Sequence, residues 1–217
     1  RILACIAQDN LLLESFRHGQ DVHARTAAEV FGLSLEDVTG QMRTRAKAVN
    51  FGIVYGISDF GLAKQLGITR KEAAGYISSY FTRYTGVKAY MDNIVQTART
   101  QGYVSTLMGR RRYLPDIRNS NFNLRSFAER TAINMPIQGT AADIMKLAMI
   151  KVAAELKKQG LKTRILLQVH DELVLEVPEA EKEIAAQLVR QAMESAVQLD
   201  IPLAADVKFG RNWAQTK

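Results

Sequence analysis

The chain of 217 residues lacks the features that mark several large classes of protein. Its single cysteine, Cys5, excludes an internal disulfide framework and a cysteine-based zinc site. No apolar run approaches the roughly 18 residues of a membrane span, and the residues after Arg1 do not resemble a signal peptide. The four prolines and fourteen glycines build no low-complexity linker. These absences predict a globular protein in a reducing, cytoplasmic location without a membrane partner.

Composition and charge further limit the class of protein and the kind of partner. Hydrophobic residues make up 47% of the chain and charged residues 24%, which is ordinary for one large or two small folded domains. The net charge of +7 is unevenly distributed: residues 43–130 contain fifteen Lys or Arg and five Asp or Glu, whereas residues 151–200 contain seven and nine. A solvated surface explains such a charge, but its confinement to one segment favours a polyanionic partner.

The hydrophobic period is helical over the first hundred residues and mixed thereafter. The predicted early helices cover 21–31 before Gly32, 39–55 before Gly56, a segment after the capping box Thr69-Arg-Lys-Glu72, and Gly86 to about Gly102. The later elements are a hairpin at 103–113, helices 122–134 and 140–159 divided by Pro136, strands 164–169 and 173–177, a helix 179–198 and a strand 203–209. This order predicts an α+β fold in which a mostly helical lobe is inserted into a base with a small antiparallel sheet.

Three polar residues, His170, Asp171 and Glu172, separate two apolar strand-like segments. An ordinary turn explains Asp171, because its side chain can hydrogen-bond to the nearby backbone. Adjacent carboxylates at a strand end, however, repel each other and suit a hard cation such as Mg²⁺, which prefers oxygen ligands. Because side chains alternate along a strand, only one of the two carboxylates needs to face such an ion. Spacing alone leaves both interpretations open.

Arg43, Lys47, Phe51 and Tyr55 recur at intervals of four in one predicted helix. Each step of four advances about 40° beyond a full turn, so the four side chains form one slowly winding stripe. In one interpretation the charged start of the helix is solvated, and Phe51 and Tyr55 enter the core. In the other, Arg43 and Lys47 hold phosphates while Phe51 offers a flat surface to a base. A nucleoside triphosphate would contact the whole stripe.

Taken together, these segments resemble DNA polymerases of family A. The stripe from Arg43 to Tyr55-Gly56 is similar to the nucleotide-binding motif of that family's fingers helix, and Val169-His-Asp-Glu172 is similar to its metal-binding palm motif. Further similar motifs are Gly109-Arg-Arg-Arg-Tyr-Leu-Pro115, Asn134-Met-Pro-Ile-Gln-Gly-Thr-Ala-Ala-Asp143 and Gly210-Arg-Asn-Trp213. The motifs occur in the family's order over essentially the whole chain.

The resemblance implies templated addition of deoxynucleotides to a primer 3′ end with the help of two Mg²⁺ ions. It implies primer-template DNA and deoxynucleoside triphosphates as partners, in the bacterial cytoplasm at the nucleoid. By motif position, Asp171 and Glu172 would bind metal and act in catalysis together with Lys47; His23, Arg43, Lys47, Phe51 and Tyr55 would bind the nucleotide; and Arg130, Asn134, Gln138 and His170 would face the DNA.

The resemblance also implies that the chain is part of a larger polymerase. It assigns 1–20 to a palm-side helix, 21–102 to the fingers, and 103–217 to the palm, including the acidic hairpin 163–178. A first palm motif with a further metal-binding aspartate would lie upstream of Arg1, so the palm sheet would be incomplete at its N-terminal side. The 217 residues alone are therefore expected to be inactive or nearly so without the upstream part of the same polymerase.

Two other functions stay open. A single-subunit RNA polymerase belongs to the same superfamily, although the spacing of Phe51 and Gln138 resembles the DNA polymerases more closely. A non-catalytic module that binds nucleic acid would also have a basic segment. The presence of Arg43, Lys47 and Asp171 argues against such a loss of catalysis.

Overall fold

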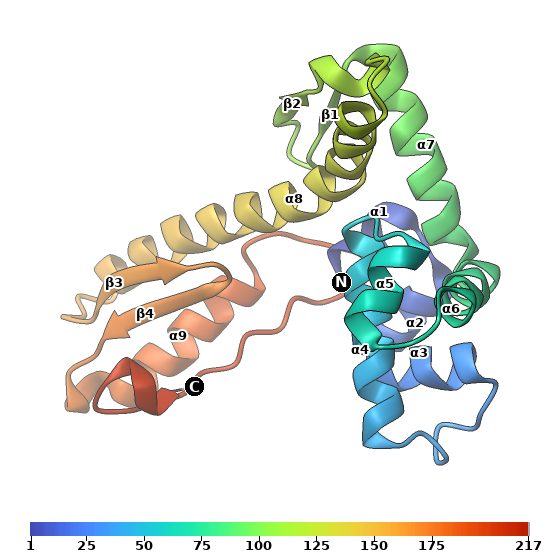
Figure 1. The fold of residues 1–217 in the computed structure, drawn as a ribbon. Helices are drawn as coiled ribbons and strands as arrows, with labels where there is room; N and C mark the ends of the chain where they lie inside the picture. The colour runs from blue at the N-terminus through green and yellow to red at the C-terminus, as the bar shows by residue number, and fades with distance from the viewer. Residues whose placement is uncertain (217) are drawn as a thin grey trace. The chain divides into compact units, whose positions relative to one another are not determined.

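A computed structural model describes residues 1–216 (Figure 1). The chain forms two compact units, Arg1–Thr140 and Ala141–Lys217. Helices dominate the described residues, and each of the two small sheets is an antiparallel pair of strands. The predicted α+β class is therefore confirmed. The subdivision into 1–20, 21–102 and 103–217 stays a prediction.

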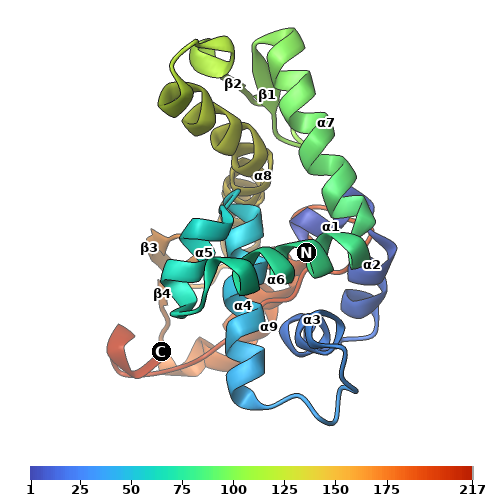
Figure 2. The same cartoon turned by 45° about the vertical axis from the view of Figure 1, so that its right-hand side comes forward.

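The first unit begins with a run of helices, of which α3 packs against α4 and α5 against α6 (Figure 2). These helices are α1 (Ile2–Ala7), α2 (Asn10–Arg17), α3 (Val22–Phe31), α4 (Gly40–Val54), α5 (Asp59–Leu66), α6 (Arg70–Arg83) and α7 (Thr85–Gln101). Between residues 1 and 216, no helix has both the length and the apolar character needed to cross a membrane.

Side-chain caps explain where the predicted helices of this unit begin. Asp21 and Thr39 accept hydrogen bonds from the first backbone amides of α3 and α4. At α6, Thr69 and Glu72 form the reciprocal bonds of the predicted capping box. Gly32 ends α3 in the left-handed conformation, as predicted. The predicted starts of α3, α4 and α6 and the predicted end of α3 are thus confirmed.

A short hairpin follows α7, as predicted over 103–113. β1 (Tyr103–Ser105) pairs antiparallel with β2 (Arg111–Tyr113), and a 3₁₀ turn at Pro115–Arg118 leads to α8 (Phe122–Lys158). Apolar side chains of α7, β1, the 3₁₀ turn with the residue before it, and α8 share one buried cluster, which consists of Ala98, Val104, Leu114, Ile117, Ala128 and Ala132. This cluster fixes the first half of α8 against α7.

The predicted break in α8 at Pro136, between helices 122–134 and 140–159, is wrong: the helix continues through the proline. A proline inside a helix removes one amide donor and disturbs the preceding turn. Here the Tyr90 hydroxyl of α7 donates to the backbone carbonyl of Ile133, in that turn, at 2.9 Å. The carbonyl that loses its amide partner is that of Ala132, four residues before Pro136, so Tyr90 supports the adjacent carbonyl of the same turn and does not replace the missing bond. The sequence pattern around the proline does not reveal this contact.

The second unit contains the end of α8, an antiparallel hairpin of β3 (Arg164–Val169) and β4 (Glu172–Glu176), a 3₁₀ turn at Glu179–Glu181, and α9 (Lys182–Glu194). The hairpin packs against both helices (Figure 1). The buried residues of this core are Val152, Leu156, Val189 and Ala192, with Ile165, Leu173 and Leu175 of the strands packed against them.

Three predictions for this unit need correction. Glu172 belongs to β4 and pairs with Val169, so the turn has two residues and not three. The predicted helix 179–198 begins as a 3₁₀ turn and ends at Glu194, where the next residue, Ser195, caps it. The segment 203–209 is not a strand: within the described residues each sheet has only two strands, and neither sheet pairs with this segment.

Candidate functional site

Three members of the predicted stripe, Arg43, Lys47 and Phe51, lie on α4, and the fourth, Tyr55, caps its C-terminal end. Phe51 and Tyr55 each keep 50% of their surface exposed, so the interpretation in which both enter the core is wrong. α4 instead buries a different face, made by Ala46, Val49, Gly52 and Ile53. The stripe is therefore a surface, which we call the α4 surface: Arg43, Lys47, Phe51 and Tyr55.

Arg43 is anchored to the start of α3. Its Nε donates to Asp21 Oδ2 at 2.6 Å, and Asp21 Oδ1 accepts from the amides of His23 and Ala24 at 2.9 and 3.1 Å. Partial burial raises the pKa of Asp21, but the Arg43 hydrogen bond and the two amides outweigh it, so the net pKa lies below that of an ordinary aspartate. The charged carboxylate thus orients the guanidinium and leaves its terminal N–H groups for an anionic ligand.

Lys47, Phe51 and His23 form one contact group on the α4 surface. The Lys47 Nζ lies 5.8 Å from the centroid of the Phe51 ring. The ring of His23, on α3, lies 6.1 Å from that of Phe51 at an interplanar angle of 31°. No carboxylate among residues 1–216 pairs with Lys47. Its positive charge is therefore available to a ligand.

Polar residues behind the surface hold His23. Asn50 Nδ2 lies 3.0 Å from His23 Nδ1, and Thr26 lies within hydrogen-bond distance of both Asn50 and the buried Tyr84 hydroxyl. Burial lowers the pKa of His23; Asp21 opposes this, and the net pKa lies below the ordinary value of 6.5. The ring is thus uncharged near neutral pH.

Tyr55 connects the α4 surface to α8. Gln138 Nε2 donates to the Tyr55 hydroxyl at 2.8 Å, and Asn134 Nδ2 donates to the carbonyl of Val54 at 3.2 Å. Two of the residues predicted to face DNA therefore lie directly beside a residue predicted to bind the nucleotide. The chain separation between Gln138 and Tyr55 is 83 residues, so the fold and not local sequence brings them together.

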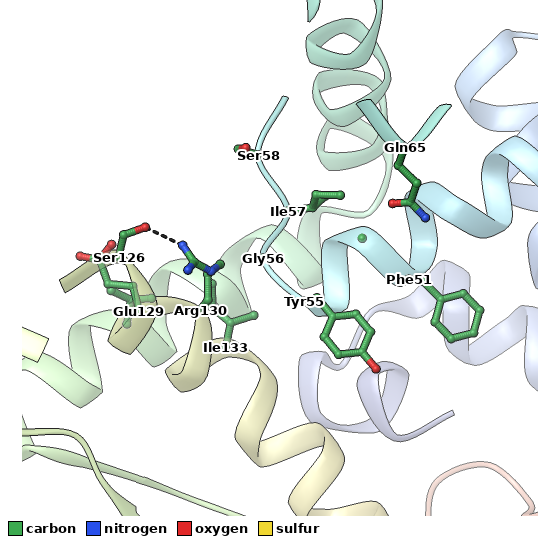
Figure 3. A pocket seen from close by; sticks show the side chains of 12 residues that line it. Phe51, Tyr55, Gly56, Ile57, Ser58, Gln65, Ser126, Glu129, Arg130 and Ile133 are labelled. Carbon is green, nitrogen blue, oxygen red and sulfur yellow. Dashed lines mark hydrogen bonds between the residues drawn. The ribbon is translucent and has the colours of Figure 1, made fainter. Parts of the chain in front are cut away.

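A pocket of about 620 Å³ opens beside Phe51 and Tyr55 (Figure 3). Gly56 contributes a left-handed turn with φ of 64°, and a Cβ at this position would lie only 3.2 Å from Arg130 Cγ. Arg130 Nη1 donates to Ser126 Oγ at 2.7 Å, which holds the guanidinium on the α8 side of the pocket (Figure 3). The pocket is lined by residues of α4, α5, α7 and α8 and the turn after α4.

The acidic hairpin belongs to the second unit. His170 and Asp171 form the turn of this hairpin. His170 has a left-handed φ of 52°, which is uncommon for a residue other than glycine. The backbone carbonyl of His170 accepts a hydrogen bond from Gln168 Nε2 at 2.6 Å. Asp171 and Glu172 are both exposed. Their carboxylates are the oxygen ligands that Mg²⁺ prefers. No group of three His, Cys, Asp or Glu suited to a metal gathers within residues 1–216, so this pair could supply only part of a coordination shell.

The first unit thus brings together most of the predicted site residues. Its members are His23, Arg43, Lys47, Phe51, Tyr55, Arg130, Asn134 and Gln138, whereas His170, Asp171 and Glu172 lie in the second unit. The predictions missed Asp21, Thr26 and Asn50. Asp21 is at a helix-capping position two residues before His23, so the sequence could have revealed that the two lie close together. The contact between Asn50 and His23 spans 27 residues, and no local sequence pattern indicates it.

Two cations, an uncharged histidine and an exposed phenyl ring are side chains that can bind phosphates and stack on a base. Residues 1–215 match the sequence profile described as DNA polymerase family A, and the chain belongs to that family. Among its relatives, DNA polymerase I of Geobacillus stearothermophilus is 59% identical over 217 residues, and DNA polymerase I of Bacillus subtilis is 56% identical over 217 residues.

A solved structure shares the fold. It is the POL domain of Pol1 from M. smegmatis in complex with DNA primer-template and dNTP, and it matches 99% of this chain with a TM-score of 0.95 and 47% identity. The match covers 38% of that chain. All of this chain aligns with the two curated relatives, of which it spans 25% of the length. The 217 residues therefore correspond to about a quarter of such a protein.

Proposed function

We propose that the chain is the part of a DNA-directed DNA polymerase that binds the incoming nucleotide and part of the primer-template. The complete enzyme, in the bacterial cytoplasm at the nucleoid, would join a deoxynucleotide to the primer 3′ end. The observation that carries the proposal is the α4 surface, where Arg43 and Lys47 lie beside the exposed ring of Phe51. Membership of family A and the neighbour's bound DNA and dNTP support it.

Charge and exposure support the nucleotide roles that the family resemblance implies. Arg43, oriented by Asp21, and Lys47, free of a carboxylate, would contact the triphosphate together with His23. Lys47 is also the candidate proton donor to the leaving pyrophosphate. Phe51 would pack on the nucleotide's base and sugar.

The contacts around Tyr55 support the DNA roles that the family resemblance implies. Tyr55 would lie beside the templating base, in or near the pocket that it lines with Arg130. Gln138 and Asn134, which already hydrogen-bond to the end of α4, would face the duplex. Amide side chains can reach minor-groove acceptors that all base pairs share, so such contacts tolerate any sequence. His170, in the second unit, would lie near the primer end.

Family A polymerases generally depend on divalent metal ions, and the acidic hairpin fits such an ion in part. Asp171 and Glu172 would be ligands, and the family resemblance gives Asp171 the greater weight. When bound, two Mg²⁺ ions would lower the pKa of the attacking hydroxyl and stabilise charge on the phosphates. Further ligands would come from water, from the substrate phosphates and from a segment outside this chain.

This division of the metal site predicts that the 217 residues alone do not extend a primer, or do so only weakly. A primer-extension assay on this polypeptide with Mg²⁺ measures this directly. Restoring the upstream part of the polymerase is expected to restore elongation. Clear elongation by the 217 residues alone would contradict the proposed ligand set.

A non-catalytic module that binds nucleic acid is the alternative to exclude. It would retain duplex affinity but add no nucleotide, even with the upstream segment restored. The polymerase proposal predicts both duplex binding and nucleotide incorporation in that longer protein, with a strong preference for deoxynucleotides over ribonucleotides. A preference for ribonucleotides would instead favour an RNA polymerase.

A further inference from the structure

A chain of hydrogen bonds leads from the buried Tyr84 through Thr26 and Asn50 to His23. Tyr84 Oη lies 3.2 Å from Thr26 Oγ1, and Asn50 Nδ2 lies 3.0 Å both from Thr26 Oγ1 and from His23 Nδ1. Tyr84 and Thr26 are fully buried, whereas His23 reaches the α4 surface. Buried groups therefore act on a side chain that faces the proposed ligand.

Thr26 sets the direction of these hydrogen bonds. Its hydroxyl has a single proton, and the nearest acceptor is the Val22 carbonyl at 2.8 Å, closer than Asn50 Oδ1 at 3.3 Å. With its proton donated to Val22, the Thr26 oxygen accepts from the Asn50 amide and from the Tyr84 hydroxyl. The second N–H of the Asn50 amide then points at His23 Nδ1, which can accept it only without a proton of its own.

We propose that Asn50, oriented by Thr26, is a positioning residue that holds His23 in the neutral tautomer with its proton on Nε2, so that this N–H donates to the triphosphate. The inference deepens the proposed function and rests on it. The α4 surface would then offer two fixed positive charges, Arg43 and Lys47, and one uncharged donor whose direction the protein determines.

The charged groups around the ring are consistent with this tautomer. On α3, burial lowers the pKa of His23 and Asp21 raises it, while Arg43 and Lys47 on α4 lower it again. The net pKa lies below 6.5. Burial also raises the pKa of Tyr84, so its hydroxyl remains a donor at the far end of the hydrogen-bond chain. Near neutral pH an uncharged His23 adds no charge to the α4 surface, whose positive charges are those of Arg43 and Lys47.

Nitrogen-15 NMR of the histidine rings in the 217-residue chain tests the tautomer without any assay of activity. His18 is an internal contrast, because its Nδ1 lies 2.9 Å from the Glu14 carbonyl, which can only accept a hydrogen bond. The His23 signal, identified by its loss in His23→Gln, is expected to show a proton on Nε2 alone, whereas His18 is expected to show one on Nδ1.

The variant Asn50→Asp reverses the key hydrogen bond, because a carboxylate can only accept. We expect Nδ1 of His23 to become protonated in Asn50→Asp and to stay unprotonated in the matched control Asn93→Asp, on the exposed side of α7. The inference would be overturned by a proton on Nδ1 in the unsubstituted chain. It would equally be overturned by an unchanged tautomer in Asn50→Asp.

Asn50→Leu separates positioning from structural support and adds no charge. His23 then has no Nδ1 partner, both tautomers become populated, and a smaller fraction of the protein is competent to bind. In a longer polymerase that contains this segment, we expect KM for the deoxynucleoside triphosphate to rise about 2- to 10-fold and kcat to change less than about 2-fold. The ring spectrum of the same variant in the 217-residue chain should show both tautomers.

The controls distinguish a failure of the positioning role of Asn50 from a failure of the proposed nucleotide-binding function. An unchanged KM in Asn50→Leu, or an equal rise in Asn93→Leu, would overturn the positioning role. If Lys47→Ala also left nucleotide affinity unchanged, the proposed function itself would fail, while the tautomer seen by NMR would be unaffected. Failure of the positioning role and failure of the proposed function would therefore give different experimental results.

Discussion

The Asp9 carboxylate accepts a hydrogen bond from the backbone amide of Gly86 at 3.0 Å, across 77 positions of the chain. The same side chain accepts from Leu12 at 3.2 Å and from Val87 at 3.4 Å, so one buried carboxylate caps the starts of both α2 and α7. Gly86 permits this approach, because a Cβ there would lie 2.9 Å from the Ala7 carbonyl oxygen. Asp9 thus joins α2 to α7 in the first unit.

Loss of this shared cap should destabilise the chain. Asp9→Ala leaves buried amides of two helices without an acceptor, and we expect the free energy of unfolding to fall by about 2–4 kcal/mol. Asp92→Ala, which removes an exposed carboxylate paired with Lys88 on α7, is the control and should cost less than about 0.5 kcal/mol. Urea unfolding of both variants measures the difference. Equal losses would show that Asp9 is not a structural cap.

The turn of α8 that precedes Pro136 should be stabilised by Tyr90. Tyr90→Phe removes the donor to the Ile133 carbonyl, and we expect a loss of about 1 kcal/mol in the free energy of unfolding. Tyr113→Phe removes a hydroxyl from a side chain that is 66% exposed and should change stability by less than about 0.5 kcal/mol. Thermal or urea unfolding compares the two. A smaller effect at Tyr90 than at Tyr113 would mean that the helix needs no outside donor.

The pair of Asp21 and Arg43 should stabilise the fold in a pH-dependent way. Burial opposes ionisation of Asp21, but the Arg43 hydrogen bond and the α3 amides lower its pKa in the folded chain. Its contribution is therefore complete above the unfolded pKa of about 3.9 and is lost as the pH falls through the lower, folded pKa. Because the pair is partly solvated, we expect Asp21→Asn to cost less than about 1 kcal/mol near neutral pH.

Urea unfolding at a series of pH values checks the sign of this dependence. The stability difference between the unsubstituted chain and Asp21→Asn should be constant above about pH 5 and should shrink towards pH 3. A difference that grows as the pH falls would mean that Asp21 has a raised and not a lowered pKa in the fold.

Local chemistry was sufficient to predict the helix starts and the stripe from Arg43 to Tyr55, but it left open whether Phe51 and Tyr55 are exposed. Asp21, Thr39 and Thr69 are capping residues whose oxygens serve amides within three positions, so their effect is visible in the sequence. The four-residue spacing from Arg43 to Tyr55 likewise depends only on helix geometry.

The failed predictions concern contacts between distant segments. The sequence around Pro136 indicates a break, whereas in the fold Tyr90, 43 positions away from Ile133, donates to the carbonyl of Ile133 in the turn before the proline. The segment 203–209 has the alternation of a strand, but alternation does not supply a pairing partner, and neither described sheet pairs with this segment. The sequence likewise did not predict the contact of Asn50 with His23, because only the packing of α4 against α3 brings the two residues together.

The central claim is that the α4 surface binds the incoming nucleotide, and Lys47→Ala tests it most directly. In a longer polymerase that contains this segment, single-nucleotide incorporation and duplex affinity are measured for Lys47→Ala and for the control Lys64→Ala, an exposed lysine of α5. We predict that Lys47→Ala lowers kcat/KM for the nucleotide by about 10- to 100-fold and leaves duplex affinity within about 2-fold, while Lys64→Ala changes neither. Equal losses of incorporation and duplex affinity in Lys47→Ala, or incorporation as high as in the control, would contradict the account.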